Sequence, residues 1–184
     1  MKSKWLLLVL PLFLSACGYN TIQTMDEGAA AAKQQIEVQL QRRADLVPNL
    51  VETVKGYAKQ EESIFTAVAE ARAGLAGAVQ SGNIGQMATA NDAMTGALGR
   101  LLAISENYPT LKSDQNFLRL QDELSGTENR IAVARTDYNN AVRDYNAYIR
   151  KFPAVLTAKV TGAQARAYFE TTSAAAQNAP AVKF

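Results

Sequence analysis

A heptad repeat in the second half of the chain constrains the fold more than any other feature. Apolar and aromatic residues recur every seven positions from Phe117 to Phe152, and a companion series runs from Leu120 to Tyr148. The first series is Phe117, Leu124, Ile131, Tyr138, Tyr145 and Phe152, and the second is Leu120, Thr127, Ala134, Ala141 and Tyr148. A repeat of this length is typical of helices that pack with a left-handed supercoil. It predicts a helix from Asp114 to Phe152, about 58 Å long at 1.5 Å per residue.

The remainder of the chain also carries helical patterns. Apolar positions at helical spacing occur in three further segments, which are 25–60, 64–79 and 84–106. Val142 and Ile149 widen the apolar stripe of the heptad segment, which favours a bundle over a two-stranded coil. We therefore predict an all-α fold, an elongated antiparallel up-down helical bundle with a long, coiled-coil-like last helix. The bundle has four helices, or three if the first two segments are continuous.

The first seventeen residues have the features of an export signal. Lys2 and Lys4 precede the ten-residue apolar run 5–14, which is too short to span a membrane and typical of a signal peptide. Leu14-Ser15-Ala16-Cys17 then resembles a bacterial lipobox, in which the cysteine receives a diacylglycerol and the chain is cleaved before it. We predict a signal peptide over 1–16 and a lipid anchor at Cys17. The alternative is an ordinary secretory signal with an incidental cysteine.

This interpretation divides the chain into segments. Residues 17–28 are expected to form the lipidated tether, 29–170 the helical bundle domain, and 171–184 a flexible tail. For segment 155–170, the sequence fits either an amphipathic helix or a partly ordered tail. We expect the body to lie outside the cytoplasm, anchored to the cell membrane or the outer membrane. Gly18 after the cysteine favours the outer membrane where a cell has two membranes.

Composition argues against most catalytic chemistry. The chain has no histidine, and its one cysteine is the predicted lipid anchor, so the usual general base, thiol nucleophile and metal ligands are missing. Removing Lys2 and Lys4 with the signal leaves 17 basic against 17 acidic residues, which is not the charge balance of a nucleic-acid-binding protein. We expect no metal, no cofactor and no enzymatic activity. Carboxylate-only catalysis is the alternative that the many Asp and Glu residues leave open.

The stretch around Pro48 raises a structural problem. Pro48 lies inside an apolar helical period that continues on both sides, where it removes a backbone donor and crowds the preceding turn. We predict a bend, with Asp45 capping a restarted helix that has Pro48 in its first turn. Arg43 lies seven residues after Ile36 and seven before Leu50, on the apolar face. A guanidinium on that face needs polar partners.

Antiparallel pairing of the first and last long helices suggests the partner of Arg43. The pairing places Arg43 opposite residues 129–138, and the nearest carboxylates are Glu128 and Asp137. We expect Glu128, because the bend at Pro48 should move the pairing toward lower residue numbers. Asp45 is a nearby alternative, and Arg42 is a solvated charge in the plainest interpretation. The candidate interaction or register residues are Arg42, Arg43, Asp45, Glu128 and Asp137.

The chain resembles the LemA family over most of its length. The resemblance is carried by LQRRADLVPNLVETVKGYAKQE (40–61), EAR (70–72), ENYPTLKSDQNFLRLQDELSGTENRIAVARTDYNNAV (106–142) and YNAYIRKFPAVLTAK (145–159). It implies a helical bundle tethered to a membrane near its N-terminus. It implies no established reaction, so no catalytic residues carry over. Members of the family commonly have an N-terminal transmembrane helix where this chain has the lipobox.

These observations lead to one functional hypothesis and two alternatives. We expect a non-enzymatic, membrane-anchored envelope lipoprotein that serves as a scaffold or adaptor for an envelope protein not identified by the sequence. The first alternative is a carboxylate-dependent enzyme or a direct modulator of an enzyme. The second is a helper in membrane remodelling.

Overall fold

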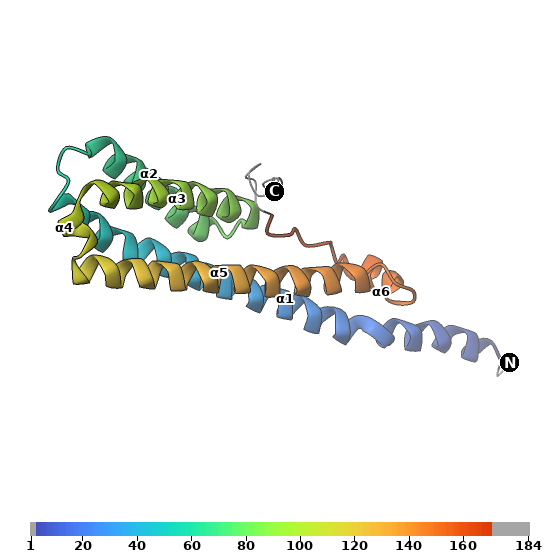
Figure 1. Ribbon diagram of the computed structural model, residues 1–184. Coiled ribbons are helices and arrows are strands. Elements are labelled where there is room, and N and C mark those ends of the chain that lie inside the picture. Colours follow the sequence, from blue (N-terminus) through green and yellow to red (C-terminus); the bar gives the residue numbers. More distant parts are fainter. Residues whose placement is uncertain (1–2, 171–184) are drawn as a thin grey trace, which may run out of the picture. The chain divides into compact units, whose positions relative to one another are not determined.

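The computed structural model describes the backbone of residues 3–170 and the side chains of residues 18–170, and all regular structure in that range is helical (Figure 1). The elements are α1 (Ser3–Lys55), α2 (Glu62–Ser81), α3 (Ile84–Ile104), the short 3₁₀ turn η1 (Ser105–Asn107), α4 (Pro109–Lys112), α5 (Gln115–Tyr148) and α6 (Ala154–Thr161). The predicted all-α bundle is confirmed, and α1 and α2 are separate helices. The predicted tail, 171–184, lies outside the described residues.

The chain forms two compact units rather than the single predicted domain. Unit 1 combines the chain up to Gln35 with Ala134–Tyr168, and unit 2 is built around Ile36–Val133. Helices α1 and α5 each contribute to both units. Residues 17–28, expected to serve as a tether, are part of α1.

Unit 2 contains a helical hairpin made by α2 and α3, which lie side by side (Figure 1). Gly82 ends α2 with a φ of 66°, a left-handed conformation that glycine adopts without strain. The Asn83 side chain then caps α3 by accepting a hydrogen bond of 3.0 Å from the backbone N–H of Gln86. This glycine–asparagine pair keeps the connection short and sets the two helices antiparallel.

Asp114 fixes the start of α5. Its Oδ1 accepts hydrogen bonds of 2.9 Å from the backbone N–H groups of Asn116 and Phe117. The Tyr57 hydroxyl, just beyond the end of α1, donates to Asp114 Oδ2 at 2.9 Å. These hydrogen bonds lower the pKa of Asp114, and the bond from Phe117 N–H contributes more than the bond from Tyr57. One carboxylate therefore caps α5 and ties its first turn to the loop that follows α1.

The heptad residues of α5 form the core, except at its end. Phe117, Leu124, Ile131, Tyr138 and Tyr145 are buried, together with Leu120, Thr127 and Ala134 of the companion series. The prediction for Phe152 is wrong, because α5 ends at Tyr148 and Phe152 is 78 % exposed in the turn before α6. In the sequence, the heptad pattern therefore continues for one position beyond the end of α5.

The predicted restart of the first helix at Asp45 is also wrong. Helix α1 runs through Pro48 without a break, and Asp45 is an exposed residue that accepts a bond of 2.9 Å from Gln41 Nε2. Pro48 has no N–H for the carbonyl of Ala44, four residues earlier. Arg72 of α2 supplies the missing donor, with Nε 2.9 Å from the Ala44 oxygen. A side chain from the neighbouring helix thus satisfies the carbonyl that proline leaves open.

Unit 1 has its own small core around the C-terminal part of α5. Ile22, Tyr145, Ile149 and Ala158 are buried together, with partly buried neighbours that include Tyr148. Helix α6 supplies Ala158 and ends at Gly162, which has a φ of 71°. The amphipathic helix considered for 155–170 therefore stops at Thr161.

The segment after α6 is not helical, but it is held by polar contacts with α5. The side-chain amide of Asn146 donates to the Arg166 carbonyl and accepts from the Arg166 N–H, both at 2.9 Å. The Tyr138 hydroxyl donates to the Ala167 carbonyl at 2.8 Å. The buried Asn146 side chain thus bonds with the backbone of this non-helical segment in the way that a neighbouring backbone would.

Candidate functional site

The most deeply buried charge in the described part of the chain is Arg43, on α1. Only 4 % of Arg43 is exposed. Its Nη1 donates to Asn91 Oδ1 of α3 at 2.7 Å and lies 2.5 Å from Glu128 Oε2 of α5. The predicted ion pair with Glu128 is confirmed. Asn91 was not anticipated from the sequence, where it is one polar residue among the alanines and methionines of its segment.

The electrostatics of this cluster favour specificity over stability. Burial lowers the pKa of Arg43, and the charge of Glu128 acts in the opposite direction. The contact with Glu128 brings the charges together without hydrogen-bond geometry, and Arg43 Nε is a buried donor with no acceptor. Because removing such a charge from water offsets much of the attraction, we expect the pair to contribute more to the register of the three helices than to their stability.

The other candidate residues lie at the surface. Arg42 contacts Glu123 at 2.6 Å, and both side chains are substantially exposed, so this pair adds little stability. Asp45 bonds only with Gln41 among the contacts seen. Asp137 is an exposed residue of unit 1.

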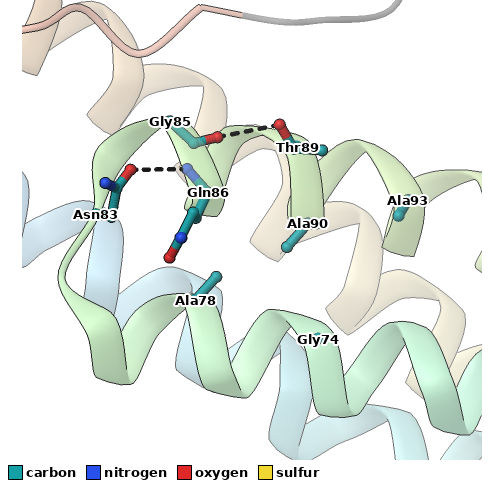
Figure 2. A pocket seen from close by; sticks show the side chains of 8 residues that line it. All are labelled: Gly74, Ala78, Asn83, Gly85, Gln86, Thr89, Ala90 and Ala93. Carbon is teal, nitrogen blue, oxygen red and sulfur yellow. Dashed lines mark hydrogen bonds between the residues drawn. The ribbon is translucent and has the colours of Figure 1, made fainter.

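An open groove of about 580 Å³ lies between α2 and α3 near their connection (Figure 2). Its lining residues are Gly74, Ala78, Asn83, Gly85, Gln86, Thr89, Ala90 and Ala93. Ala78 and Ala90 point into the space between the helices, and the bond from Gln86 N–H to Asn83 closes the end at the turn. The sequence signal that could have located this groove is small residues four apart, Gly74 with Ala78 on one helix and Thr89 with Ala93 on the other.

The junction next to Cys17 is packed into unit 1. Gly18 is buried, with a φ of +152° that is far from the helical value and favours glycine. A Cβ at this position would lie 3.4 Å from the Tyr148 hydroxyl and 3.8 Å from Cα of Ala154, the first residue of α6. The side chain of Cys17 lies outside the described part. No helix in that part combines the length and apolarity needed to cross a membrane.

A further ion pair joins the first and last segments of unit 1. Arg166 Nε lies 2.7 Å from Asp26 Oδ1 of α1, beside a pocket of about 340 Å³ that Gln23 and Thr161 also line. The bond from Arg166 lowers the pKa of Asp26, while burial acts against it. The same bond raises the pKa of Arg166. Among residues 18–170, no three His, Cys, Asp or Glu side chains gather as metal ligands would.

The fold and its polar contacts define a class, the all-α helical bundle proteins, here with side-chain contacts that link one helix to another. Within that class, the sequence profile of the LemA family matches residues 32–184, and the chain belongs to this family. The matched range includes Arg43 and Arg72, whose side chains link α1 to other helices.

Curated relatives include magnetosome proteins of two bacteria. The chain is 35 % identical to magnetosome proteins MamQ 1 and MamQ 2 of Paramagnetospirillum magneticum over 83 % of its length. It is also 35 % identical to magnetosome protein MamQ of Magnetospirillum gryphiswaldense over 82 % of its length. The match spans 64 % of the length of each of these relatives.

Proposed function

We propose that this protein is an envelope lipoprotein, anchored in a membrane through lipid on Cys17, whose helical bundle serves as a scaffold or adaptor for other envelope proteins. The observation that carries the proposal is the junction at Cys17. A lipobox-like LSAC is followed at once by Gly18, which is buried in unit 1. Cleavage before Cys17 would therefore remove the apolar leader and leave the packed residues in place.

The buried residues of the bundle suit a binding scaffold better than an enzyme active site. Among the described residues, no Asp or Glu is fully buried. The buried polar residues are Arg43, Asn91, Ser105, Thr127, Asn146 and Thr157. Arg43, Asn91 and Asn146 all join one segment of the bundle to another. An arrangement of this kind supports a scaffold over a carboxylate-dependent enzyme, because Asp26, which lines the pocket of unit 1, is held in an ion pair with Arg166.

The anchor can be tested through the only tryptophan, Trp5, which lies in the proposed leader. The mature protein should show tyrosine emission alone, and its intact mass should include acyl chains on residue 17. Cys17→Ser should accumulate as an uncleaved, tryptophan-fluorescent precursor, while Ser15→Thr should still be processed. A native mature protein with a free thiol at Cys17 would overturn the anchor.

The scaffold can be tested by photo-crosslinking in the native membrane. A photoreactive amino acid at Ala93, on the groove between α2 and α3, should capture a defined envelope protein. The matched control is Thr95, an exposed residue two positions along the same helix and outside the groove lining. Identical capture from both positions, or capture from neither, would count against a scaffold that works through this surface.

A further inference from the structure

Unit 1 exposes large apolar side chains on and beside α6. Phe152 is 78 % exposed, Leu156 55 % and Val160 85 %. Leu156 and Val160 are four residues apart and share one face of α6, and Phe152 lies in the turn that enters the helix. The opposite face packs inward through Ala154, Thr157 and Ala158. An eight-residue helix with an inward face of small residues and an outward face of large ones marks an interaction surface.

Within the chain segment that forms this surface, all charges are of one sign. Exposed Arg150 and Lys151 immediately precede Phe152, and exposed Lys159 immediately precedes Val160. No acidic residue occurs between Asp144 and Glu170. Apolar side chains bordered by lysine and arginine are the combination that binds the headgroup region of an anionic bilayer. A surface that binds another protein does not require flanking charges of a single sign.

The proposed lipid anchor lies next to the start of α6. Gly18 packs against Ala154, the first residue of α6, and Cys17 is the next residue along the chain, with its Cα about 3.8 Å away. Tyr19, on the other side of Gly18, is 46 % exposed, and tyrosine is a residue of membrane interfaces. Because no free linker separates the acylated residue from α6, an anchored Cys17 brings α6 to the bilayer surface.

We infer that Phe152, Leu156 and Val160 form a docking face that inserts into the headgroup region of the membrane holding Cys17, with Arg150, Lys151 and Lys159 contacting anionic lipid headgroups. The inference rests on the lipid anchor of the proposed function. It adds that unit 1 is seated on the bilayer in a fixed orientation instead of moving freely on a tether. The membrane then contacts unit 1 directly through the docking face, in addition to holding the lipid on Cys17.

The test uses the processed lipoprotein in vesicles of phosphatidylcholine and phosphatidylglycerol. Acylation of Cys17 leaves an introduced cysteine as the only free thiol, so Leu156→Cys and Val160→Cys can each carry one environment-sensitive fluorophore. Val38→Cys and Val133→Cys, exposed aliphatic positions of unit 2, are the matched controls. The labels on α6 should shift to the blue and be quenched about twofold or more by lipids with a nitroxide near the headgroup, as shallow insertion requires. The controls should not.

Each remaining outcome has one meaning. Quenching on α6 no greater than at the controls would overturn the docking face, and so would a blue shift without lipid quenching, which would show that protein covers the surface. Replacing Lys151 and Lys159 with glutamine should weaken quenching in anionic vesicles and leave it unchanged in neutral ones. The intact mass of the same samples reports the anchor separately. If Cys17 is unmodified, the proposed function fails, and the same labelled variants carrying Cys17→Ser, added to the same vesicles, still test α6.

Discussion

The carbonyl of Ala44 illustrates how single atoms decide whether α1 stays continuous. Pro48 removes the intrahelical donor of this carbonyl, and Arg72 replaces it from α2 with a charged Nε–H at 2.9 Å. Arg43, the residue directly before Ala44, contacts Asn91 and Glu128. Both arginines therefore link α1 to other helices, Arg72 by supplying a missing backbone partner and Arg43 through a buried polar cluster. Their energetic roles can be separated by mutation.

The contact between Arg72 and Ala44 should depend on Pro48. Arg72→Ala should lower the free energy of unfolding by about 1–2 kcal/mol, because it strands a partly buried carbonyl. In a Pro48→Ala background, the new N–H at position 48 can serve the same carbonyl, so the cost of Arg72→Ala should fall by at least about 0.5 kcal/mol. Urea denaturation of the four proteins measures the difference. Equal costs in both backgrounds would mean that Arg72 contributes in another way.

The Arg43 cluster should show coupling that a surface pair lacks. Glu128→Leu should cost about 1–3 kcal/mol, because it leaves a buried guanidinium with Asn91 alone. The double variant with Arg43→Met should be more stable than Glu128→Leu alone. The exposed pair of Arg42 and Glu123, changed to Met and Leu, is the matched control and should couple by less than about 0.5 kcal/mol. Additive effects at Arg43 and Glu128 would refute a role in register.

At the scale of elements, the sequence predicts the long helices well and their ends poorly. Heptad spacing identifies the buried face of α5 because repeated burial leaves a period in the residue types. It places Phe152 in the core because a period carries no information about where the helix stops. The pairing of Arg43 with Glu128 follows from antiparallel geometry. Asn91 and Arg72 could not be anticipated, since the placement of α2 and α3 depends on tertiary packing.

The end of α5 can be tested with three alanine substitutions. Ile131→Ala should lower the free energy of unfolding by about 2–5 kcal/mol, because its side chain is fully buried. Phe152→Ala should change it by less than about 0.5 kcal/mol in detergent-free buffer, as should the surface control Ser125→Ala. Denaturant unfolding gives all three values. A large loss of unfolding free energy in Phe152→Ala would show that the Phe152 side chain belongs to the core.

The ion pair of Asp26 and Arg166 should make unit 1 sensitive to acid. The folded pKa of Asp26 is lowered, mainly by the bond from Arg166. The stabilisation is therefore fully present above the unfolded carboxyl pKa of about 3.9 and is lost as the pH falls through the lower, folded value. Asp26→Asn should remove this part of the acid dependence and lower stability at neutral pH. Denaturant midpoints measured down the pH scale test this, with exposed Asp144→Asn as the control.

At the scale of the whole molecule, the division into two units has no local signal in the sequence. The segment expected to be one bundle, 29–170, is apolar at helical spacing on both sides of the boundaries at Gln35 and Ala134. Helices α1 and α5 cross these boundaries without a glycine–proline linker, which is the usual mark of a junction. Unit 1 is defined instead by contacts between distant segments, such as Asn146 with Arg166.

The composition of unit 1 sets an order of events during synthesis. Unit 2 is built mainly on the stretch Ile36–Val133, with Phe169 added from the later chain, so most of its contacts can form as soon as that stretch has emerged. Unit 1 joins the first part of the chain to nearly the last, and Asp26 waits for Arg166, which follows 140 residues later. Loops of that length close late. The end of the molecule that carries Cys17 therefore leaves the synthetic machinery first, yet unit 1 cannot complete its contacts until the chain around Arg166 has emerged.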